Sequence, residues 1–316
     1  MNMKGIISLG EALIDFIPLD KENITYQKSP GGAPANVAVA AAKLGAKSTF
    51  VGKVGQDVLG EFLKETLQSH GVDVTSMILT EEARTGVVFV TLDESGERNF
   101  SFYIDPSADR FLSIDNLDSE LFTGHNVLHY GSISMISEPS RSATLQAVKM
   151  AKEQNMIVSY DPNLRLGLWP SEEDARETIS SMLKEASIVK ISDEELTFLT
   201  GETELEAGIK KLSKYNIPVL LVTYGSKGSY VHVDNKTIHV PAMKVETVDT
   251  TGAGDAFVSG ILYQLSERNT ALGEIALDQW KEIVEFASVS GALAASTRGA
   301  MTALPTLDEV KATLQK

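Results

Sequence analysis

Short apolar runs alternate with longer stretches of helical periodicity along most of the 316-residue chain. Buried parallel strands produce such runs, and the helices that cover both faces of a sheet occupy the stretches between them. The strand candidates are residues 6–9, 48–52, 127–130, 157–160, 188–191 and 219–223. The helix candidates are residues 58–69, 140–153, 172–184, 204–214 and 277–295. The pattern predicts an α/β fold with a doubly wound, mostly parallel sheet that binds ligands at the carboxyl ends of its strands.

Two segments break this alternation. Residues 13–26 and 85–103 are hairpin-like, and the second contains the charged turn Asp93-Glu94-Ser95-Gly96-Glu97. They predict an extra β layer, with strands within residues 12–30 and 85–105. Neither a linker nor a low-complexity segment divides the sequence, and 43% hydrophobic residues are ample for a core. We therefore expect residues 1–316 to form a single domain.

The composition excludes several classes of function. A formal net charge of −15 argues against binding to nucleic acid or acidic membranes, because both need basic patches. The chain has no cysteine for disulfides or thiolate zinc sites, and its five histidines show no metal-ligand spacing. No stretch reaches the roughly 18 apolar residues of a membrane span, and the first residues lack a long apolar signal region. We expect a cytoplasmic enzyme without nucleic-acid or membrane partners.

The ten residues VDTTGAGDAF at 248–257 carry the strongest functional signal. Residues 237–248 alternate as an extended segment does, and apolar residues repeat at helical spacing after it, so Gly252-Ala253-Gly254 is predicted to lie at a strand-to-helix turn. Small residues at a helix start leave backbone amides exposed, and the helix dipole favours an anion there. The motif predicts an anion hole for a phosphoryl group, with the Asp255 carboxylate beside the reacting oxygens.

Two better-known glycine motifs do not fit this segment. A dinucleotide fingerprint needs Gly or Ala at its sixth position, where this chain has Phe257. A Walker phosphate loop needs GxxxxGK followed by Ser or Thr, which the chain does not contain. A tight turn with a helix-favouring Asp would explain GAGD alone, but not the longer string.

VDTTGAGDAF resembles the C-terminal signature of the ribokinase-like, or PfkB, family of carbohydrate kinases. Residues 31–45, GGAPANVAVAAAKLG, are similar to that family's N-terminal signature. Four more stretches resemble fructokinases of the family: SYDPNLRLGLWPS at 159–171, IVKISDEELTFLTG at 188–201, FYIDPSAD at 102–109 and GAMTALPT at 299–306. The resemblance implies a ribokinase-like fold with a small β lid, ATP and Mg²⁺ as cofactors, a sugar substrate, and a homodimer formed through the lid.

The resemblance also assigns roles to individual residues. It implies that Asp255 is the general base and that Gly252, Ala253 and Gly254 form the anion hole. The implied sugar contacts are Asp15, Gly31, Gly32, Asn36, Asn163 and Arg165. Because Asn163 and Arg165 follow a strand end, an amide and a guanidinium can meet phosphate or sugar oxygens there. Asp161-Pro162-Asn163 would also make a good turn without any ligand.

Nucleotide and metal contacts follow from the same resemblance. The implied nucleotide contacts are Lys190, Ser192, Glu195, Thr223, Gly225, Gly228, Ser288 and Ser290. Glu195 also matches an acidic residue near the water shell of Mg²⁺, and Asp249 and Thr251 match a monovalent-cation site, so K⁺ is a further expected cofactor. Ser192 and Ser288 depart from the family pattern, which has Asn at both positions, and this leaves the magnesium and adenine contacts open.

The implied reaction transfers the γ-phosphoryl group of ATP to D-fructose and gives fructose 6-phosphate. Ile104-Asp105 differs from the Arg-Asn pair frequent in fructokinases, which leaves the sugar open. Ribokinase and 2-keto-3-deoxygluconate kinase are the alternatives, and the second needs a cation, which Arg98 or Arg110 would supply unless both are solvated. A sugar-sensing protein without catalysis is the non-enzymatic alternative, against which the retained Asp255 argues.

The position of Asp255 also leads to an expected pKa. An unperturbed Asp titrates near ~3.9, and a helix N-terminus favours its charged form. The sequence therefore predicts a lowered pKa and a weak base that is ionised at neutral pH. Phosphoryl transfer tolerates a weak base, because the sugar hydroxyl becomes acidic only as its bond to phosphorus forms.

Overall fold

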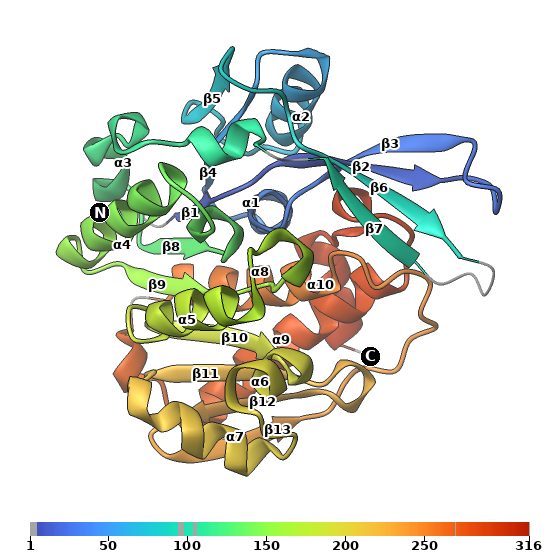
Figure 1. Ribbon diagram of the computed structural model, residues 1–316. Helices are drawn as coiled ribbons and strands as arrows, with labels where there is room; N and C mark the ends of the chain where they lie inside the picture. Colours follow the sequence, from blue (N-terminus) through green and yellow to red (C-terminus); the bar gives the residue numbers. More distant parts are fainter. Residues whose placement is uncertain (1–4, 94–97, 104–105, 269, 316) are drawn as a thin grey trace.

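Figure 1 shows the computed structural model of the chain, which describes residues 5–315 except 94–97, 104–105 and 269. Among these residues, strands form one open sheet in the order β13 (Lys236–Val240), β12 (Ser229–Val233), β11 (Val219–Thr223), β10 (Ile188–Ser192), β9 (Ile157–Tyr160), β8 (Val127–Tyr130), β1 (Ile6–Leu9), β4 (Ser48–Gly55) and β5 (Met77–Thr80). Neighbours from β11 to β5 are parallel, and β12 and β13 add two antiparallel strands at one edge. The predicted doubly wound, mostly parallel sheet is confirmed.

All six predicted apolar runs are strands, and β4 and β10 extend beyond the predicted ends. The strands β5 and β13 at the two edges, and β12 next to β13, were not predicted as sheet strands. Buried and more exposed residues alternate in β12, and most of β13 is exposed, so neither has the continuous apolar run of a central strand. Edge strands are therefore harder to find from hydrophobicity than central ones.

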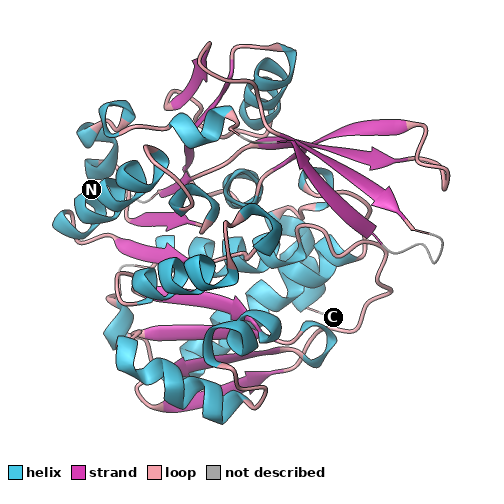
Figure 2. Cartoon of the chain, in the orientation of Figure 1, coloured by secondary structure: helices cyan, strands magenta, loops and turns pink. Residues whose placement is uncertain are grey.

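Helices cover both faces of the sheet (Figure 2). One face carries α1 (Ala33–Lys43), α8 (Ala253–Ser266) and α9 (Leu277–Ala295), and the other carries α4 (Ser140–Glu153), α5 (Glu172–Leu183), α6 (Asp193–Thr200) and α7 (Leu205–Leu212). The remaining helices are α2 (Val58–Ser69), α3 (Ser119–Thr123) and α10 (Leu307–Leu314). The five predicted helices are all present, with α5 and α7 ending before their predicted limits. Within the described part of the chain, no helix is both long and apolar enough to cross a membrane.

Two helix starts, those of α1 and α8, are brought together at the centre of the molecule. Val37 of α1 and Val258 of α8 pack in one cluster with Ile6 of β1, and the two helices are in contact. Gly252 lies at the N-cap of α8 with φ of 79°, as the predicted turn requires. The predicted extended segment 237–248 is wrong beyond Val240, where β13 ends. Because β13 is at the sheet edge and α8 packs under β1, the residues between must cross that face as a loop.

A second sheet forms the predicted β lid. Its strands, in spatial order, are β3 (Tyr26–Gly31), β2 (Leu13–Pro18), β6 (Val87–Leu92) and β7 (Arg98–Tyr103). It projects from the body of the molecule (Figure 1). Phe16 and Phe89 stack with ring centroids 4.9 Å apart and hold β2 against β6. Residues 94–97 of the predicted turn at 93–97 and the pair Ile104-Asp105 lie outside the described residues, and the single-domain organisation stays a prediction.

The crossing of α8 and α9 gives a test of the fold. A Cβ on Gly260 would lie 2.8 Å from the Cα of Ala287, so the two helices approach too closely for a side chain. We expect Gly260→Val to lower the free energy of unfolding by about 1 to 3 kcal/mol, because the added methyl groups must push α9 away. Chemical denaturation measures this, with Gly273→Ala as the control, since a Cβ there meets nothing within 4 Å. Equal stability of the Gly260→Val and parent proteins would contradict this packing.

Candidate active site

The side chains of Asn36 and Asp255 meet where the starts of α1 and α8 converge. Asn36 Nδ2 donates to Asp255 Oδ2 at 2.8 Å, across 219 residues of sequence. Asn36 is buried, and Asp255 retains partial exposure. The two signatures that the sequence predicted to be functional thus contribute one polar contact at the carboxyl edge of the sheet.

Cationic and backbone groups surround the start of α8. A Cβ on Gly254 would lie 3.4 Å from Lys190 Nζ, so the ammonium group of β10 lies beside the first turn of the helix. The N–H of Ala253 donates to the Thr250 carbonyl at 3.1 Å and closes the preceding turn. The first turn of α8 and the Lys190 ammonium thus bring together N–H donors of the kind that suits phosphate oxygens.

Asp161 is a site residue that sequence reasoning identified only as part of a turn. Its carboxylate pairs with Lys190 Nζ at 3.0 Å, and both groups are almost fully buried. Burial alone would lower the pKa of Lys190, but the carboxylates of Asp161 and Glu195 outweigh it and raise that pKa. Lys190 therefore stays charged beside α8. The signal for Asp161 was its place directly after a buried strand, where the carboxyl ends meet.

The predicted pKa of Asp255 is wrong in direction. Burial raises the pKa of Asp255 from 3.8 to about 6, although the hydrogen bond from Asn36 opposes this change. The nearby Asp161 carboxylate contributes to this raised pKa of Asp255, whereas Lys190 and Arg165 oppose it. The expectation from the helix N-terminus failed because desolvation by distant segments of the chain dominates. A pKa near 6 makes Asp255 a stronger base than expected, and it is still ionised at neutral pH.

Asp15 lies on lid strand β2, close enough to Asp255 for their charges to interact. Burial raises the pKa of Asp15 to about 6, with Arg165 lowering it and Asp255 raising it. A Cβ on Gly31 would collide with the Asp15 carboxylate, and one on Gly32 would lie 2.5 Å from the Glu11 carbonyl oxygen. The Gly-Gly pair therefore has a packing role within the protein, and its predicted contact with sugar stays a prediction.

The loop after β9 carries the next two predicted sugar contacts. Asn163 has φ of 46° and its N–H donates to Asp161 Oδ1 at 3.2 Å, so the turn predicted as the alternative is present. Arg165 is exposed, and it lines a pocket of about 480 Å³ together with Asn99, Phe100 and Phe102 of the lid. Arg165 therefore lies beside the lid, close enough for its charge to act on the carboxylates of Asp15 and Asp255.

Arg110 is not the solvated surface residue that was considered for the carboxylate-binding alternative. It is buried, its Nε lies 3.7 Å from Asp109 Oδ2, and its Nη1 donates to Ser137 Oγ at 3.3 Å. Its guanidinium thus stabilises the segment below the lid. The side chain of Arg98 lies outside the described residues.

Glu195 is fixed by two backbone amides. Its Oε1 accepts from Leu164 at 2.7 Å, and its Oε2 accepts from Ser192 at 2.8 Å within a capping box that begins α6. One oxygen of Glu195 thus supports the loop at 161–165, and the other caps α6. No cluster of three acidic or histidine side chains that could hold a metal ion occurs among the described residues. The predicted place of Glu195 near the water shell of Mg²⁺ stays a prediction.

The predicted nucleotide contacts lie along one edge of the site. Ser192 and Thr223 are register partners at the carboxyl ends of β10 and β11, and Gly225 and Gly228 shape the loop that follows. Ser288 and Ser290 lie on α9, and Ser290 Oγ is buried without a hydrogen-bond partner among the described residues. A Cβ on the adjacent Gly291 would lie 3.0 Å from the Ala253 carbonyl, which places this part of α9 beside the anion hole.

The predicted monovalent-cation residues lie just before α8. Asp249 is buried, its Oδ1 accepts from the Thr251 N–H at 3.0 Å, and its Oδ2 accepts from the Gly299 N–H at 3.1 Å. The carboxylate thus joins two loops, 248–252 and 295–300. The cation role of Asp249 and Thr251 stays a prediction.

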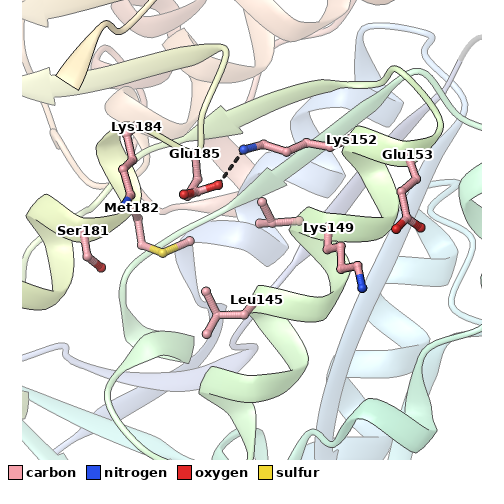
Figure 3. Close-up of a pocket in the computed structure, with 9 residues that line it drawn as sticks. Leu145, Lys149, Lys152, Glu153, Ser181, Met182, Lys184 and Glu185 are labelled. Carbon is pink, nitrogen blue, oxygen red and sulfur yellow. Dashed lines mark hydrogen bonds and ion pairs between the residues drawn. The ribbon is translucent and has the colours of Figure 1, made fainter.

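A pocket of about 430 Å³ lies elsewhere, between α4 and α5 (Figure 3). An ion pair of 2.5 Å between Lys152 and Glu185 crosses it. It contains none of the predicted site residues, and Glu153 and Met182 place it at the C-terminal ends of these helices. Those ends lie away from the carboxyl edge of a parallel sheet, where ligands bind.

The raised pKa of Asp255 predicts an effect on stability. A carboxyl whose pKa is raised on folding stabilises the protein only while it is protonated, so this stability is lost as the pH rises from about 4 through about 6. We expect Asp255→Asn to raise the free energy of unfolding by about 1 to 3 kcal/mol at pH 8, with the gain disappearing near pH 4. Denaturation across this pH range measures it, with the exposed Asp115→Asn as control. A destabilised variant at pH 8 would refute the desolvation argument.

Comparisons with known proteins agree with this geometry. The model of the pfkB family carbohydrate kinases matches residues 3–307. Fructokinase-1 of Oryza sativa subsp. japonica is 45% identical over 311 residues, which cover 96% of each protein. Probable fructokinase-6, chloroplastic, of Arabidopsis thaliana is 45% identical over 318 residues, 98% of this chain and 82% of that protein.

Solved structures are similar over almost the whole chain. A fructokinase double mutant from Vibrio cholerae O395, in a form with fructose, ADP and potassium ion bound, has a TM-score of 0.91 at 41% identity and covers 98% of both chains. Fructokinase from Xylella fastidiosa with bound ATP has a TM-score of 0.94 at 34% identity, covering 99% of this chain and 98% of that one. The chain therefore belongs to the pfkB family of carbohydrate kinases and is a sugar kinase.

Proposed function

We propose that the protein is an ATP-dependent fructokinase, which transfers the γ-phosphoryl group to a primary hydroxyl of D-fructose. The Asn36–Asp255 contact carries the proposal. It fixes the Asp255 carboxylate at the start of α8, where an anion would bind, and close to the Asp15 carboxylate of the lid. The fructokinase relatives and the fructose-bound neighbour support the choice of sugar.

In the proposed reaction, the Asp15 carboxylate accepts hydrogen bonds from sugar hydroxyls, and the Asn36 amide forms a further hydrogen bond to the sugar. Together they orient the sugar toward the nucleotide. Asp255 takes the hydroxyl proton as the oxygen bonds to the γ-phosphorus, and the bond from phosphorus to the β-phosphate oxygen breaks to release ADP. The start of α8 and the Lys190 ammonium stabilise the charge on the transferring group. When bound, Mg²⁺ would neutralise phosphate charge.

The nucleotide would extend from this point along β10 and β11. Ser192 and Thr223 lie at the strand ends, and the loop with Gly225 and Gly228 leaves the backbone open to phosphate or ribose. Ser288 and Ser290 of α9 would lie toward the adenine. Asp249 and Thr251 would order the loop before α8 around K⁺, in line with the potassium-bound relative.

We also propose that the lid forms a homodimer interface. Four lid side chains expose much of their apolar surface: Leu19 (59%), Ile24 (80%), Phe100 (55%) and Tyr103 (65%). Apolar groups gathered on a projecting sheet are typical of protein interfaces. The cytoplasmic location expected from the sequence stays a prediction.

A panel of acceptor sugars tests the proposed substrate. We expect ADP release with D-fructose to exceed that with 2-keto-3-deoxygluconate by at least about a hundredfold in kcat/KM, because the carboxylates of Asp15 and Asp255 repel a carboxylated sugar. Ribose is a neutral polyol like fructose, so the expected preference for fructose over ribose rests on the fructokinase relatives. A coupled assay for ADP, with the phosphorylated sugar identified by mass spectrometry, measures this. Preference for the carboxylated sugar would refute the fructokinase proposal and leave the sugar kinase activity intact.

The general base has its own test. Asp255→Asn keeps the shape of the side chain and can still accept from Asn36, but it cannot take a proton. We expect kcat to fall roughly 10² to 10⁴-fold while KM for ATP stays within a few-fold. The same variant should be more stable than the parent at neutral pH, so misfolding would not explain the loss. A folded Asp255→Asn that keeps more than about a tenth of the parental kcat contradicts the general-base role.

A further inference from the structure

Helix α1 has no local N-cap. Gly32, at the N-cap, has no side chain that could accept a hydrogen bond, and the first turn contains no acidic residue. Helix starts usually use a nearby Ser, Thr, Asp or Asn to bind their first amides. Here the N–H of Ala33 donates to Glu11 Oε1 at 3.2 Å. Glu11 directly follows Gly10 at the end of β1, so a residue distant in sequence caps α1 at the carboxyl edge of the sheet.

The start of α1 is also packed tightly against the segment that carries Glu11. A Cβ on Gly10 would lie 2.6 Å from Pro34 Cγ, and one on Gly32, which has φ of 100°, would lie 2.5 Å from the Glu11 carbonyl oxygen. Ser8 Oγ donates to the Pro34 carbonyl at 2.6 Å. The first turn of α1 therefore has little room to move independently of residues 8–12.

The Glu11 side chain is buried, so exposure to solvent does not explain why a carboxyl group lies here. It is 3% exposed, and its Oε2 has no hydrogen-bond partner among the described residues. Burial, together with smaller effects of the carboxylates of Asp109 and Asp255, raises the pKa of Glu11 to about 8, while Arg110 pairs with Asp109. Glu11 is thus neutral near pH 7, so it caps α1 without placing another negative charge beside Asp255.

A short series of contacts connects Glu11 to the catalytic carboxylate. Glu11 binds Ala33, and the N–H of Asn36 donates to the Gly32 carbonyl at 2.8 Å, so both residues belong to one helical turn. The side chain of Asn36 leaves that turn to donate to Asp255. A displacement of the α1 start would therefore displace Asn36 and loosen its bond to Asp255.

We propose that Glu11 is a positioning residue: by holding the start of α1, it sets the place of Asn36 and, through Asn36, of the Asp255 carboxylate. The kinetic consequence rests on the proposed general-base role of Asp255. The structural consequence does not, because it concerns only where that carboxylate lies.

Kinetics of Glu11→Ala, Asn36→Ala and the double variant test this connection. We expect Glu11→Ala to lower kcat about tenfold to a hundredfold, with KM for ATP within about threefold, because the base is displaced and the nucleotide site is not. The double variant should have about the same kcat as Asn36→Ala, since Glu11 acts through Asn36. Losses that multiply in the double variant, or a kcat of Glu11→Ala within about twofold of the parent, would overturn the proposal.

Two controls separate positioning from a general loss of stability. Glu11→Gln keeps a neutral acceptor for the Ala33 N–H and should restore kcat to within about fivefold of the parent. Thr306→Ala removes the cap of α10, which carries none of the predicted site residues, and should lower stability without lowering kcat. A Gln variant as impaired as the Ala variant, or an equal kcat loss in Thr306→Ala, would contradict the proposal.

A titration of the Asp255 carboxyl carbon by NMR needs no substrate. Because the hydrogen bond from Asn36 lowers the pKa of Asp255, loosening it in Glu11→Ala should raise the titration midpoint by about half a unit or more, and Glu11→Gln should leave it unchanged. An unchanged midpoint in Glu11→Ala would overturn the proposal whichever sugar is the substrate. A shifted midpoint together with a fully active Asp255→Asn would instead refute the general-base role alone.

Discussion

The hydrogen bond from Asn36 to Asp255 is the contact on which the active site depends. It joins the starts of α1 and α8, two helices whose positions are set separately by β1, the lid and the loop that crosses from the sheet edge. At each helix start a glycine, Gly32 or Gly252, lies close to the backbone of another segment. Glu11 caps the start of α1 from outside the helix. The bond can form only if the core beneath it, with Ile6, Val37 and Val258, is packed correctly. The placement of the proposed base, Asp255, therefore depends on the correct packing of the core.

The site keeps several carboxyl groups in places where ionisation is costly. Burial raises the pKa of Glu11, Asp15 and Asp255, and two cations, Lys190 and Arg165, reduce this effect for Asp255. A stability-optimised protein would replace such groups, whereas a kinase gains from a base that ionises just below neutral pH. The lid completes the arrangement, because Asp15 belongs to it and the pocket beside Arg165 is lined by its strands. In the proposed reaction, where Asp15 binds the sugar, sugar binding therefore depends on the position of the lid.

The central strands and the start of α8 could be predicted from the sequence. The central strands were identifiable because both of their faces are buried, and the start of α8 because Gly252 and the helical apolar spacing mark it. The edge strand β13 and the loop after Val240 were harder to predict from the sequence, since their conformation depends on where α8 packs. Asp255 was identified but its pKa was not, because desolvation comes from segments distant in sequence. Glu11 was missed as a site residue because a capping bond between distant segments leaves no local pattern. Asp161 was missed because its place after a buried strand also fits a turn, and its ion pair joins it to Lys190 on another strand.

The central claim is that Asn36 holds a desolvated Asp255 that accepts the proton in the chemical step. The pH dependence of kcat/KM in the parent and in Asn36→Ala tests it most directly, since this parameter reports ionisations of the free enzyme. The account predicts an activity that falls as the pH drops through about 6, the pKa of Asp255, and a limb displaced to higher pH in Asn36→Ala, where the bond that lowers this pKa is lost. A limb below about pH 4, as for an unperturbed carboxylate, or one at the same pH in both proteins, would contradict it.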